Sequence, residues 1–313
     1  MQKATVYRST GIWYDVKLDN GDFIKARIKG KFRTMSIKTT NPVAVGDIVD
    51  LDFTSEGEAV IKSIDKRKNY IIRKSVNLSK EAHIIASNID LAVLLVTVIN
   101  PVTSPGFIDR FTVTAQAYNV PLLIAFNKID IYDKEALKTL EKFQKAYQKA
   151  GYSTINISVI ENKAMDEFYE LIKNKTVLVS GNSGAGKSTL INKLIPDLSL
   201  KTGSISKSHN TGKHTTTFAE MFDMDDNTKI IDSPGIKGFG LVDFQTDELA
   251  RYFPEMLKLL GDCKFHNCRH INEPGCRVIQ SIEDGEFSVS RYNSYLAMYN
   301  EDNGTHYRQN NYI

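Results

Sequence analysis

Hydrophobic and polar positions alternate with a period of two along the first 67 residues of the chain. The alternation is clearest at 24–29, where Ile, Ala and Ile are separated by Lys, Arg and Lys. Turn sequences, DNGD at 19–22 and SEGE at 55–58, separate the apolar runs. A period of two predicts half-buried strands, and several short strands in so small a segment predict a β-barrel of the OB type over residues 1–67.

From Ile89 onward, short apolar runs alternate with longer amphipathic segments. The runs predict buried strands at 88–100, 120–128, 153–159, 176–179 and 229–231. The segments between them predict helices at 105–119, 134–151 and 165–174, and a fourth after residue 186. Strands that alternate with helices predict a parallel sheet covered on both faces. We therefore predict an α/β domain over 68–242 and, where this alternation stops, a mainly helical domain over 243–313.

Residues 181–188 match the phosphate-loop pattern GxxxxGK[ST], directly after an apolar strand and at the start of a helix. Glycines let the backbone N–H groups of such a loop surround a phosphate. Lys187 is expected to reach the β- and γ-phosphates, and the Ser188 hydroxyl to bind Mg²⁺. The predicted nucleotide-binding residues of the loop are Gly181, Asn182, Ser183, Gly184, Ala185, Gly186, Lys187, Ser188 and Thr189.

A second motif, NKID at 127–130, follows the strand at 120–128, where ligands bind in open α/β sheets. The Asp130 carboxylate can accept from guanine N1–H and the 2-amino group together, and adenine offers no such pair. The Lys128 stem is expected to cover the ring, and Ser158 to complete the base pocket. Alone NKID is a common turn sequence, but beside a phosphate loop it predicts a guanine nucleotide bound by Asn127, Lys128, Ile129 and Asp130.

The order of these motifs is inverted. An ordinary GTPase has its phosphate loop first, whereas here NKID precedes it by some fifty residues. A cut behind the Asp232–Gly235 loop leaves each strand–loop–helix unit intact, so the same site can reassemble in space. The sequence therefore predicts a circularly permuted P-loop GTPase domain, and not a coincidental second motif.

DSPG at 232–235 and KHTTT at 213–217 are the candidates for metal binding and γ-phosphate contact. We expect Asp232 to hold Mg²⁺ through water and the Gly235 N–H to contact the γ-phosphate. Thr216 is the predicted loop ligand for Mg²⁺, with Thr215 and Thr217 open as alternatives.

The residue after Gly235 is Ile236, whose aliphatic side chain cannot orient an attacking water. Another residue must therefore orient the water, and our hypothesis gives this role to His214.

The three cysteines of the chain lie within 263–276 and, with one histidine, have the spacing C-x4-C-x-H-x5-C. Three thiolates and an imidazole suit tetrahedral zinc in a closed, structural site. The predicted ligands are Cys263, Cys268, His270 and Cys276, and His266 is expected to be free. The alternative is three buried thiols beside a surface histidine. So few cysteines, clustered in this way, argue against a disulfide framework.

Charge adds an asymmetry to this picture. Residues 1–80 hold 16 Lys/Arg against 9 Asp/Glu, and the remainder holds 24 against 28. A basic N-terminal module indicates a polyanionic partner, with a solvated basic face as the alternative. Four aromatic residues of this module are candidates to stack on bases, with core packing as the alternative reading: Trp13, Tyr14, Phe23 and Phe32.

The rest of the composition is ordinary, with 42% hydrophobic and 25% charged residues. The first ten residues lack the apolar core of a signal peptide, and the most apolar run, 91–99, is too short to span a membrane. We therefore expect a cytoplasmic protein without a membrane partner.

Taken together, these motifs resemble those of the RsgA (YjeQ/YloQ) family of circularly permuted GTPases that act on the small ribosomal subunit. The resemblance extends over nearly the whole chain and includes VGDIVDL at 45–51 and NID at 88–90. It implies an OB domain, a permuted GTPase domain and a zinc domain, with GTP/GDP, Mg²⁺ and one structural Zn²⁺ as cofactors. It also implies a monomer that hydrolyses GTP late in 30S maturation, binds 16S rRNA and is stimulated by the subunit. The alternative function is an RNA-binding assembly scaffold with a mainly structural nucleotide.

Overall fold

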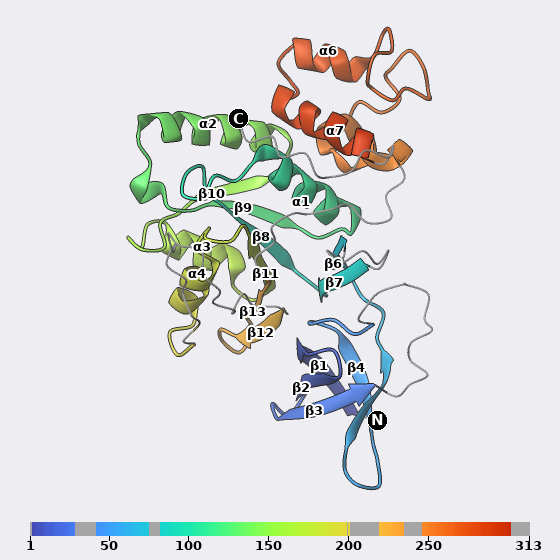
Figure 1. Cartoon of the computed structure of the whole chain (residues 1–313), viewed down its shortest axis with the longest axis vertical. Helices are drawn as coiled ribbons and strands as arrows, with labels where there is room; N and C mark the ends of the chain where they lie inside the picture. The colour runs from blue at the N-terminus through green and yellow to red at the C-terminus, as the bar shows by residue number, and fades with distance from the viewer. Residues whose placement is uncertain are drawn as a thin grey trace, which may run out of the picture.

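The computed structural model describes residues 2–28, 42–74, 82–198, 200, 219–234 and 246–301. In Figure 1 the described chain forms a barrel at the lower end, an α/β core in the middle and a helical C-terminal part at the upper end. This arrangement confirms the predicted fold class. None of the described helices combines the length and the apolar character needed to cross a membrane.

The N-terminal barrel has five strands in the order β1-β2-β3-β5-β4, and β4 pairs back with β1 to close it. The strands are β1 (Gln2–Ser9), β2 (Trp13–Leu18), β3 (Phe23–Ile28), β4 (Ile48–Phe53) and β5 (Ala59–Ile64). Alternate side chains such as Val6, Val16 and Leu51 fill its interior, as the period of two predicts. Residues 5–18 read in the sequence as one run, because they contain no turn signal as strong as DNGD, but the structure divides them between β1 and β2.

Between the barrel and the core lies a hairpin of β6 (Tyr70–Lys74) and β7 (Ala82–Ser87), which the sequence pattern did not predict. Its contact with the barrel is made by the VGD stretch. Buried Asp47 accepts two hydrogen bonds of 2.7 Å from Arg67 and one of 2.6 Å from the Ser87 hydroxyl. Gly46 has a φ of +91°, and a Cβ there would lie 2.2 Å from the Ser87 carbonyl oxygen. This junction therefore requires glycine at 46 and a carboxylate at 47.

The α/β core contains a sheet in the order β10-β9-β8-β11-β13-β12. The strands are β8 (Leu91–Val96), β9 (Leu122–Phe126), β10 (Ser153–Asn156), β11 (Thr176–Gly181), β12 (Glu220–Asp223) and β13 (Lys229–Asp232). The first five in this order are parallel, as predicted, and β12, which was not predicted, runs antiparallel to β13.

Helices cover both faces of this sheet (Figure 1). α1 (Pro105–Ala117) and α2 (Lys134–Lys149) pack in one apolar cluster, whereas α3 (Met165–Ile172) and α4 (Lys187–Leu194) pack in another. Strand β8 divides its side chains between the two clusters, since Leu94 faces one and Leu95 the other. Burial on both faces explains why the strand reads as a continuous apolar run.

The barrel continues this sheet. Strand β1 pairs with β12 through one register pair, Arg8 with Glu220, so that the barrel and the core form one continuous sheet of eleven strands.

The C-terminal part consists of short helices around the Cys/His cluster: the 3-10 helix η3 (Thr246–Tyr252), α5 (Pro254–Leu257), α6 (Arg277–Glu283) and α7 (Val289–Glu301). It packs on the core mainly through α7 and α1 (Figure 1). The predicted domain boundary near 67 falls between the barrel and β6, and the one near 242 lies outside the described residues. Both boundaries stay predictions.

Candidate nucleotide and metal sites

The phosphate loop connects β11 to α4, in the strand–loop–helix context that the sequence predicts. Its glycines are required by close contacts. A Cβ at Gly181 would lie 2.4 Å from the Leu95 carbonyl oxygen, and one at Gly186 would lie 2.5 Å from the Asn127 side-chain nitrogen. Both glycines also have positive φ, +150° and +103°. The backbone can therefore approach a phosphate here without side chains in the way.

Lys187 begins α4 and is buried within this loop. Its ammonium donates hydrogen bonds of 2.8 Å to the Gly181 carbonyl and 3.1 Å to the Asn182 carbonyl. Burial lowers the pKa of Lys187, and the nearby Asp232 carboxylate acts in the opposite direction. The charge is thus placed at the centre of the loop, where a phosphate would compete with two carbonyls for it.

Asn127 links the base-recognition motif to the phosphate loop. Its side-chain amide donates 2.9 Å to the Ala185 carbonyl, and its oxygen accepts 3.3 Å from the Val159 N–H. The Tyr132 hydroxyl donates 2.7 Å to the Asn127 carbonyl, a contact that the sequence did not indicate. Two motifs in inverted order along the chain are therefore adjacent in space.

The remaining residues of NKID follow in a 3-10 turn, η2 (Ile129–Ile131). Lys128 adopts a left-handed φ of 66° and donates 2.7 Å to the Asn100 carbonyl. Ser158, at the end of the neighbouring strand, is buried and donates 2.5 Å to the Asp130 carboxylate. The structure thus brings Ser158, predicted to complete the base pocket, into contact with the Asp130 carboxylate.

Asp232 ends β13 and is buried near Lys187. Among the described residues its Oδ1 has no hydrogen-bond partner. Burial raises the pKa of Asp232 to about 6, while Lys187 opposes the rise. An orphaned, buried carboxylate oxygen beside a phosphate loop fits a hydrated Mg²⁺ held jointly with Ser188. The other residues assigned to metal, γ-phosphate or water contacts, His214, Thr216 and Gly235, lie outside the described residues, as does Ile236.

The loop after β8 was not predicted to belong to the site. Its Asn100 carbonyl binds Lys128, and Pro101 lies against the phosphate loop, 3.5 Å from the position of a Cβ on Gly184. The only sequence signal was the Asn-Pro pair, which indicates a turn but no ligand.

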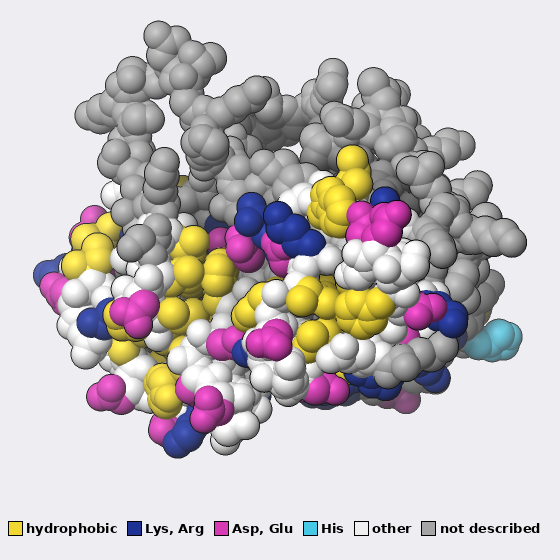
Figure 2. Space-filling view, turned by 90° about the horizontal axis from the view of Figure 1, so that it is seen from below, with side chains coloured by type: hydrophobic (Ala, Val, Ile, Leu, Met, Phe, Trp, Pro, Cys, Tyr) yellow, Lys and Arg dark blue, Asp and Glu magenta, His cyan; other side chains and the backbone are white. Residues whose placement is uncertain are grey.

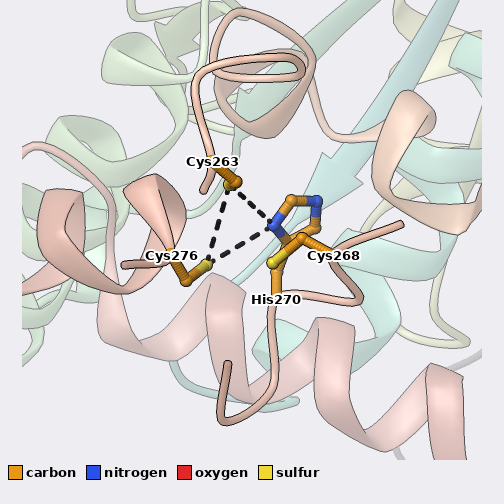
Figure 3. A group of neighbouring side chains, drawn as sticks. All are labelled: Cys263, Cys268, His270 and Cys276. Atoms are coloured by element: carbon orange, nitrogen blue, oxygen red, sulfur yellow. Dashed lines mark hydrogen bonds between the residues drawn. The ribbon is translucent and has the colours of Figure 1, made fainter. Parts of the chain in front are cut away.

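The four predicted zinc ligands meet in one cluster (Figure 3). The ligand atoms of Cys263, Cys268, His270 and Cys276 all lie within 4.8 Å of one another, and exposed His266 is outside the group. Cys263 Sγ and Cys276 Sγ are 4.0 Å apart, and His270 Nδ1 is 3.6 and 3.5 Å from them. Tetrahedral zinc, with bonds of about 2.3 Å to sulfur and about 2.0 Å to nitrogen, needs edges of about 3.8 and 3.5 Å. The cluster is therefore compatible with a structural zinc ion.

Hydrogen bonds from surrounding residues hold the loop that carries the Cys/His cluster in place. The Glu273 carboxylate accepts from the backbone N–H groups of Arg269, Ile271 and Asn272 at 2.8–3.1 Å. Burial alone would raise the pKa of Glu273, but these donors lower it to about 2. On α7, the Tyr292 and Tyr295 hydroxyls donate to the carbonyls of His270 and Arg269. Burial also raises the pKa of the Cys268 thiol to about 12, so a metal cation is needed to hold it as a thiolate at neutral pH.

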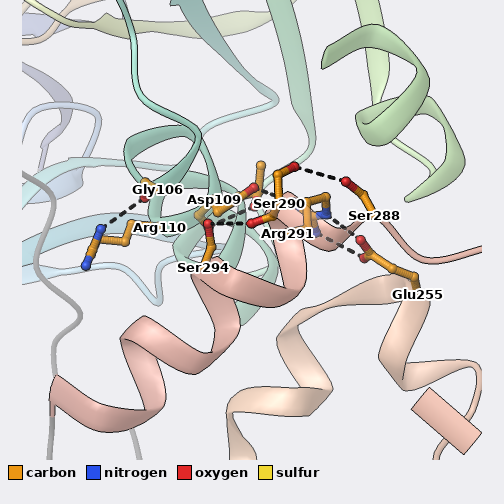
Figure 4. Close-up of polar contacts among 9 residues, drawn as sticks. Gly106, Asp109, Arg110, Glu255, Ser288, Ser290, Arg291 and Ser294 are labelled. Carbon is orange, nitrogen blue, oxygen red and sulfur yellow. Dashed lines mark hydrogen bonds and ion pairs between the residues drawn. The ribbon is translucent and has the colours of Figure 1, made fainter. Parts of the chain in front are cut away.

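Arg291 joins the C-terminal part to the core (Figure 4). Its side chain, on α7, is completely buried and binds Asp109 of α1 at 2.6 Å and Glu255 of α5. The guanidinium also lies 5.1–5.5 Å from three ring centroids, those of Tyr147, Tyr152 and Phe253. Burial alone would lower the pKa of Arg291, but the two carboxylates keep it well above its ordinary value. The ion pairs thus connect α7 with α1 and α5, and the Tyr147 ring adds a contact with α2.

The barrel contacts the core on both sides of a cavity of about 570 Å³ between β12, the end of α4 and strands β1–β3. At one end Arg8 binds Glu220 at 3.8 Å. At the other, the Tyr7 hydroxyl and the Lys17 ammonium each bind Asp223 at 2.6 Å. These contacts fix the barrel against β12.

The described outer surface of the barrel is of mixed charge. Lys3, Lys17 and Arg27 are each paired with a carboxylate. Figure 2, which views the molecule from the barrel end, shows hydrophobic side chains among Lys/Arg and Asp/Glu of both signs. Of the aromatic residues predicted to stack on bases, Trp13 and Phe23 are exposed by 41% and 57%, and Tyr14 is in the core. Phe32 lies outside the described residues.

Two family models match the chain: the RsgA N-terminal domain at residues 3–61 and the RsgA GTPase at residues 64–242. The small ribosomal subunit biogenesis GTPase RsgA of Christiangramia forsetii is 54% identical over 299 residues, which cover 95% of each chain. The protein of the same name from Flavobacterium johnsoniae is 51% identical over 312 residues, 99% of this chain and 96% of its own.

Solved structures agree with these matches. YjeQ from Thermotoga maritima superposes with a TM-score of 0.75 and 30% identity, covering 97% of this chain and 99% of its own. YloQ, described as a circularly permuted GTPase, has a TM-score of 0.71 and 25% identity, covering 98% and 97%.

Proposed function

Since the chain belongs to the RsgA family of circularly permuted GTPases, we propose that it hydrolyses GTP to GDP and phosphate during late maturation of the small ribosomal subunit. The relatives that cover nearly its whole length are named small ribosomal subunit biogenesis GTPases. We further propose that it acts in the cytoplasm as a monomer and binds 16S rRNA.

The observation that carries this proposal is the hydrogen bond from the Asn127 amide to the Ala185 carbonyl. It makes the base-recognition loop and the phosphate loop parts of one site despite their inverted order. In that site the Asp130 carboxylate, oriented by Ser158, is assigned to the N1–H and 2-amino groups of guanine. Adenine would offer no such pair of donors to this half-buried carboxylate, which supports selection for guanine.

We assign phosphate binding to the positively charged and N–H-rich part of the site. Lys187 is positioned to exchange its two carbonyl partners for phosphate oxygens, and the loop N–H groups and the start of α4 supply further donors. The site would bind Mg²⁺ through Ser188, Asp232 and a Thr of 215–217, with Thr216 as our choice. When bound, Mg²⁺ neutralises charge that develops on the phosphates. The Gly235 N–H is assigned to the γ-phosphate.

The aliphatic side chain of Ile236, the residue after Gly235, cannot orient the attacking water. We therefore assign that role to His214. The assignment implies slow hydrolysis by the protein alone and large stimulation when the 30S subunit docks. His214→Ala should leave binding of a GTP analogue intact and remove most of the stimulated rate. An unchanged stimulated rate would show that another residue orients the water.

A zinc ion at the Cys/His cluster is assigned a structural role, because four protein ligands leave no open position. We propose that the zinc domain and the barrel both contact the subunit. The described cations of the barrel are largely paired, so the charge excess falls on residues 29–41, which contain four Lys/Arg and no acidic residue. That composition supports an rRNA contact through the barrel module.

The second candidate function is an RNA-binding scaffold with a structural nucleotide. Phosphate release measured with and without 30S subunits distinguishes the two. If the protein is a GTPase, the rate of phosphate release should rise with the concentration of 30S subunits. If it is a scaffold, bound GTP should persist. Co-sedimentation with 30S subunits in GTP analogue, in GDP and without nucleotide then tests whether the nucleotide state controls release. Equal binding to 30S subunits in all three states would show that the nucleotide does not control release.

A further inference from the structure

Three charged side chains form a row across three strands at the junction of barrel and core. Arg8 of β1 is the register partner of Glu220 of β12, and Glu220 is the register partner of Asp232 of β13. Residues directly opposite in antiparallel strands project from the same face of a sheet, with Cβ atoms about 5 Å apart. The row therefore runs from the barrel to the carboxylate assigned to Mg²⁺.

The two ends of this row differ in exposure. Arg8 Nη1 lies 3.8 Å from Glu220 Oε1, and the two side chains are half and one third exposed. Asp232 is buried, with Oδ1 unpartnered among the described residues, and Glu220 is its direct register partner on the neighbouring strand. Glu220 is thus a second negative charge beside the magnesium site, and its nearest described counter-ion belongs to another domain.

We propose that Glu220 is a positioning residue for the magnesium site and that Arg8 of the barrel sets how much of its charge the metal experiences. Glu220 attracts the hydrated cation toward Asp232, whereas Arg8 neutralises part of that attraction. A polyanion that draws Arg8 away would therefore strengthen Mg²⁺ binding in the core. Binding of a polyanion to the barrel would then change Mg²⁺ affinity at the nucleotide site through the Arg8–Glu220 ion pair. This inference rests on the assignment of Asp232 to Mg²⁺ in the proposed function.

The two substitutions that test the row have opposite expected signs. A unit charge roughly 8 Å from Mg²⁺, screened almost as in water, changes its affinity by about three- to tenfold at low ionic strength. Glu220→Gln should raise the Mg²⁺ concentration that half-saturates binding of a fluorescent, non-hydrolysable GTP analogue by that factor. Arg8→Gln should lower it by about two- to threefold, since the arginine lies farther from the metal.

The double variant completes the test. In the double variant the two opposite effects should largely offset each other, because the Coulomb energies of the two charges with the cation add. Arg27→Gln is the matched control: it also removes a barrel arginine from an ion pair, with Glu58, but β3 does not pair with the core. The Mg²⁺ concentration that half-saturates analogue binding should be the same in this variant as in the unaltered protein.

All these measurements use the full chain without ribosomes, so they separate two kinds of failure. If both single variants raised the Mg²⁺ concentration needed for half-saturation, the ion pair would have only a structural role, and the proposal would be overturned. Unchanged Mg²⁺ dependence with normal analogue binding would overturn the proposal and leave the proposed function standing. Absence of analogue binding by the unaltered protein would overturn both.

Discussion

Replacement of Arg291 by alanine should detach the C-terminal part from the core. The substitution leaves the carboxylates of Asp109 and Glu255 in a completely or largely buried place without their cation. Removing one partner of a buried ion pair costs about 3–5 kcal/mol, and loss of a desolvated cation from aromatic faces costs about 2 kcal/mol more. A domain is stable by only about 5–15 kcal/mol. We therefore expect a loss of about 4 kcal/mol or more in the free energy of unfolding of this part.

Zinc release during urea denaturation, followed with a colorimetric chelator, is the appropriate assay. Trp13 is the single tryptophan of the chain and lies in the barrel, so its fluorescence reports barrel unfolding separately. In Arg291→Ala, zinc release should move to much lower urea, while the Trp13 transition stays in place. The matched control is Arg277→Ala, which breaks an exposed 3.7 Å ion pair with Asp284 and should cost about 0–1 kcal/mol.

The reasoning also predicts a rescue. Replacing Arg291 by Met together with Asp109 and Glu255 by Leu removes all three charges, and buried ion clusters replaced in this way are often no less stable. The triple variant should therefore release zinc at higher urea than Arg291→Ala. Equal shifts for Arg291→Ala and Arg277→Ala, or no recovery in the triple variant, would refute the assignment of this cluster as the joint.

Three further outcomes follow from the two sites. Gly186→Ala should abolish GTP-analogue binding while the circular dichroism spectrum persists, because its Cβ meets the base-loop amide at 2.5 Å; Gly151→Ala, also at positive φ but with open space, should bind normally. Asp130→Asn should lose GTP affinity and gain affinity for xanthosine triphosphate in competition assays, and an unchanged preference would refute the base assignment. Cys276→Ser should lower the zinc content measured by atomic absorption, whereas His266→Ala should retain one zinc per chain.

The sequence predicted most of the fold because local patterns determined it. The barrel has four apolar runs, one of which the structure divides into β1 and β2. These runs and the parallel strands follow from hydrophobic periods of two or from continuous apolar runs, which depend only on neighbours in sequence. Strand β12, EMFD, was missed because its two apolar residues stand between two carboxylates, too few for an apolar run. The β6–β7 hairpin was missed although its strands are neighbours in sequence, because residues 75–81 between them contain neither Gly nor Pro to signal a turn.

The candidate site was predictable where a motif combines several residues at fixed spacing. Asn127, Ser158 and the phosphate loop meet as their motifs imply, and the four zinc-type ligands converge. Arg291 was not predictable, since an arginine on a surface-like helix is normally exposed, and its partner Asp109 is 182 residues away. Glu220 carried no motif at all, and only the register of three strands shows its position beside Asp232.

The continuous sheet has a consequence for how this chain can be dissected and exchanged. Sequence similarity divides it into modules that end at 61 and begin at 64, which suggests pieces that could be grafted or expressed apart. A fragment that starts at 64 would keep every nucleotide motif but lose the strand beside Glu220, leaving β12 as a bare edge able to pair with other molecules. A barrel borrowed from a relative would have to keep Arg8 in register. The barrel and the core thus share one continuous sheet, and a chimera should be cut elsewhere.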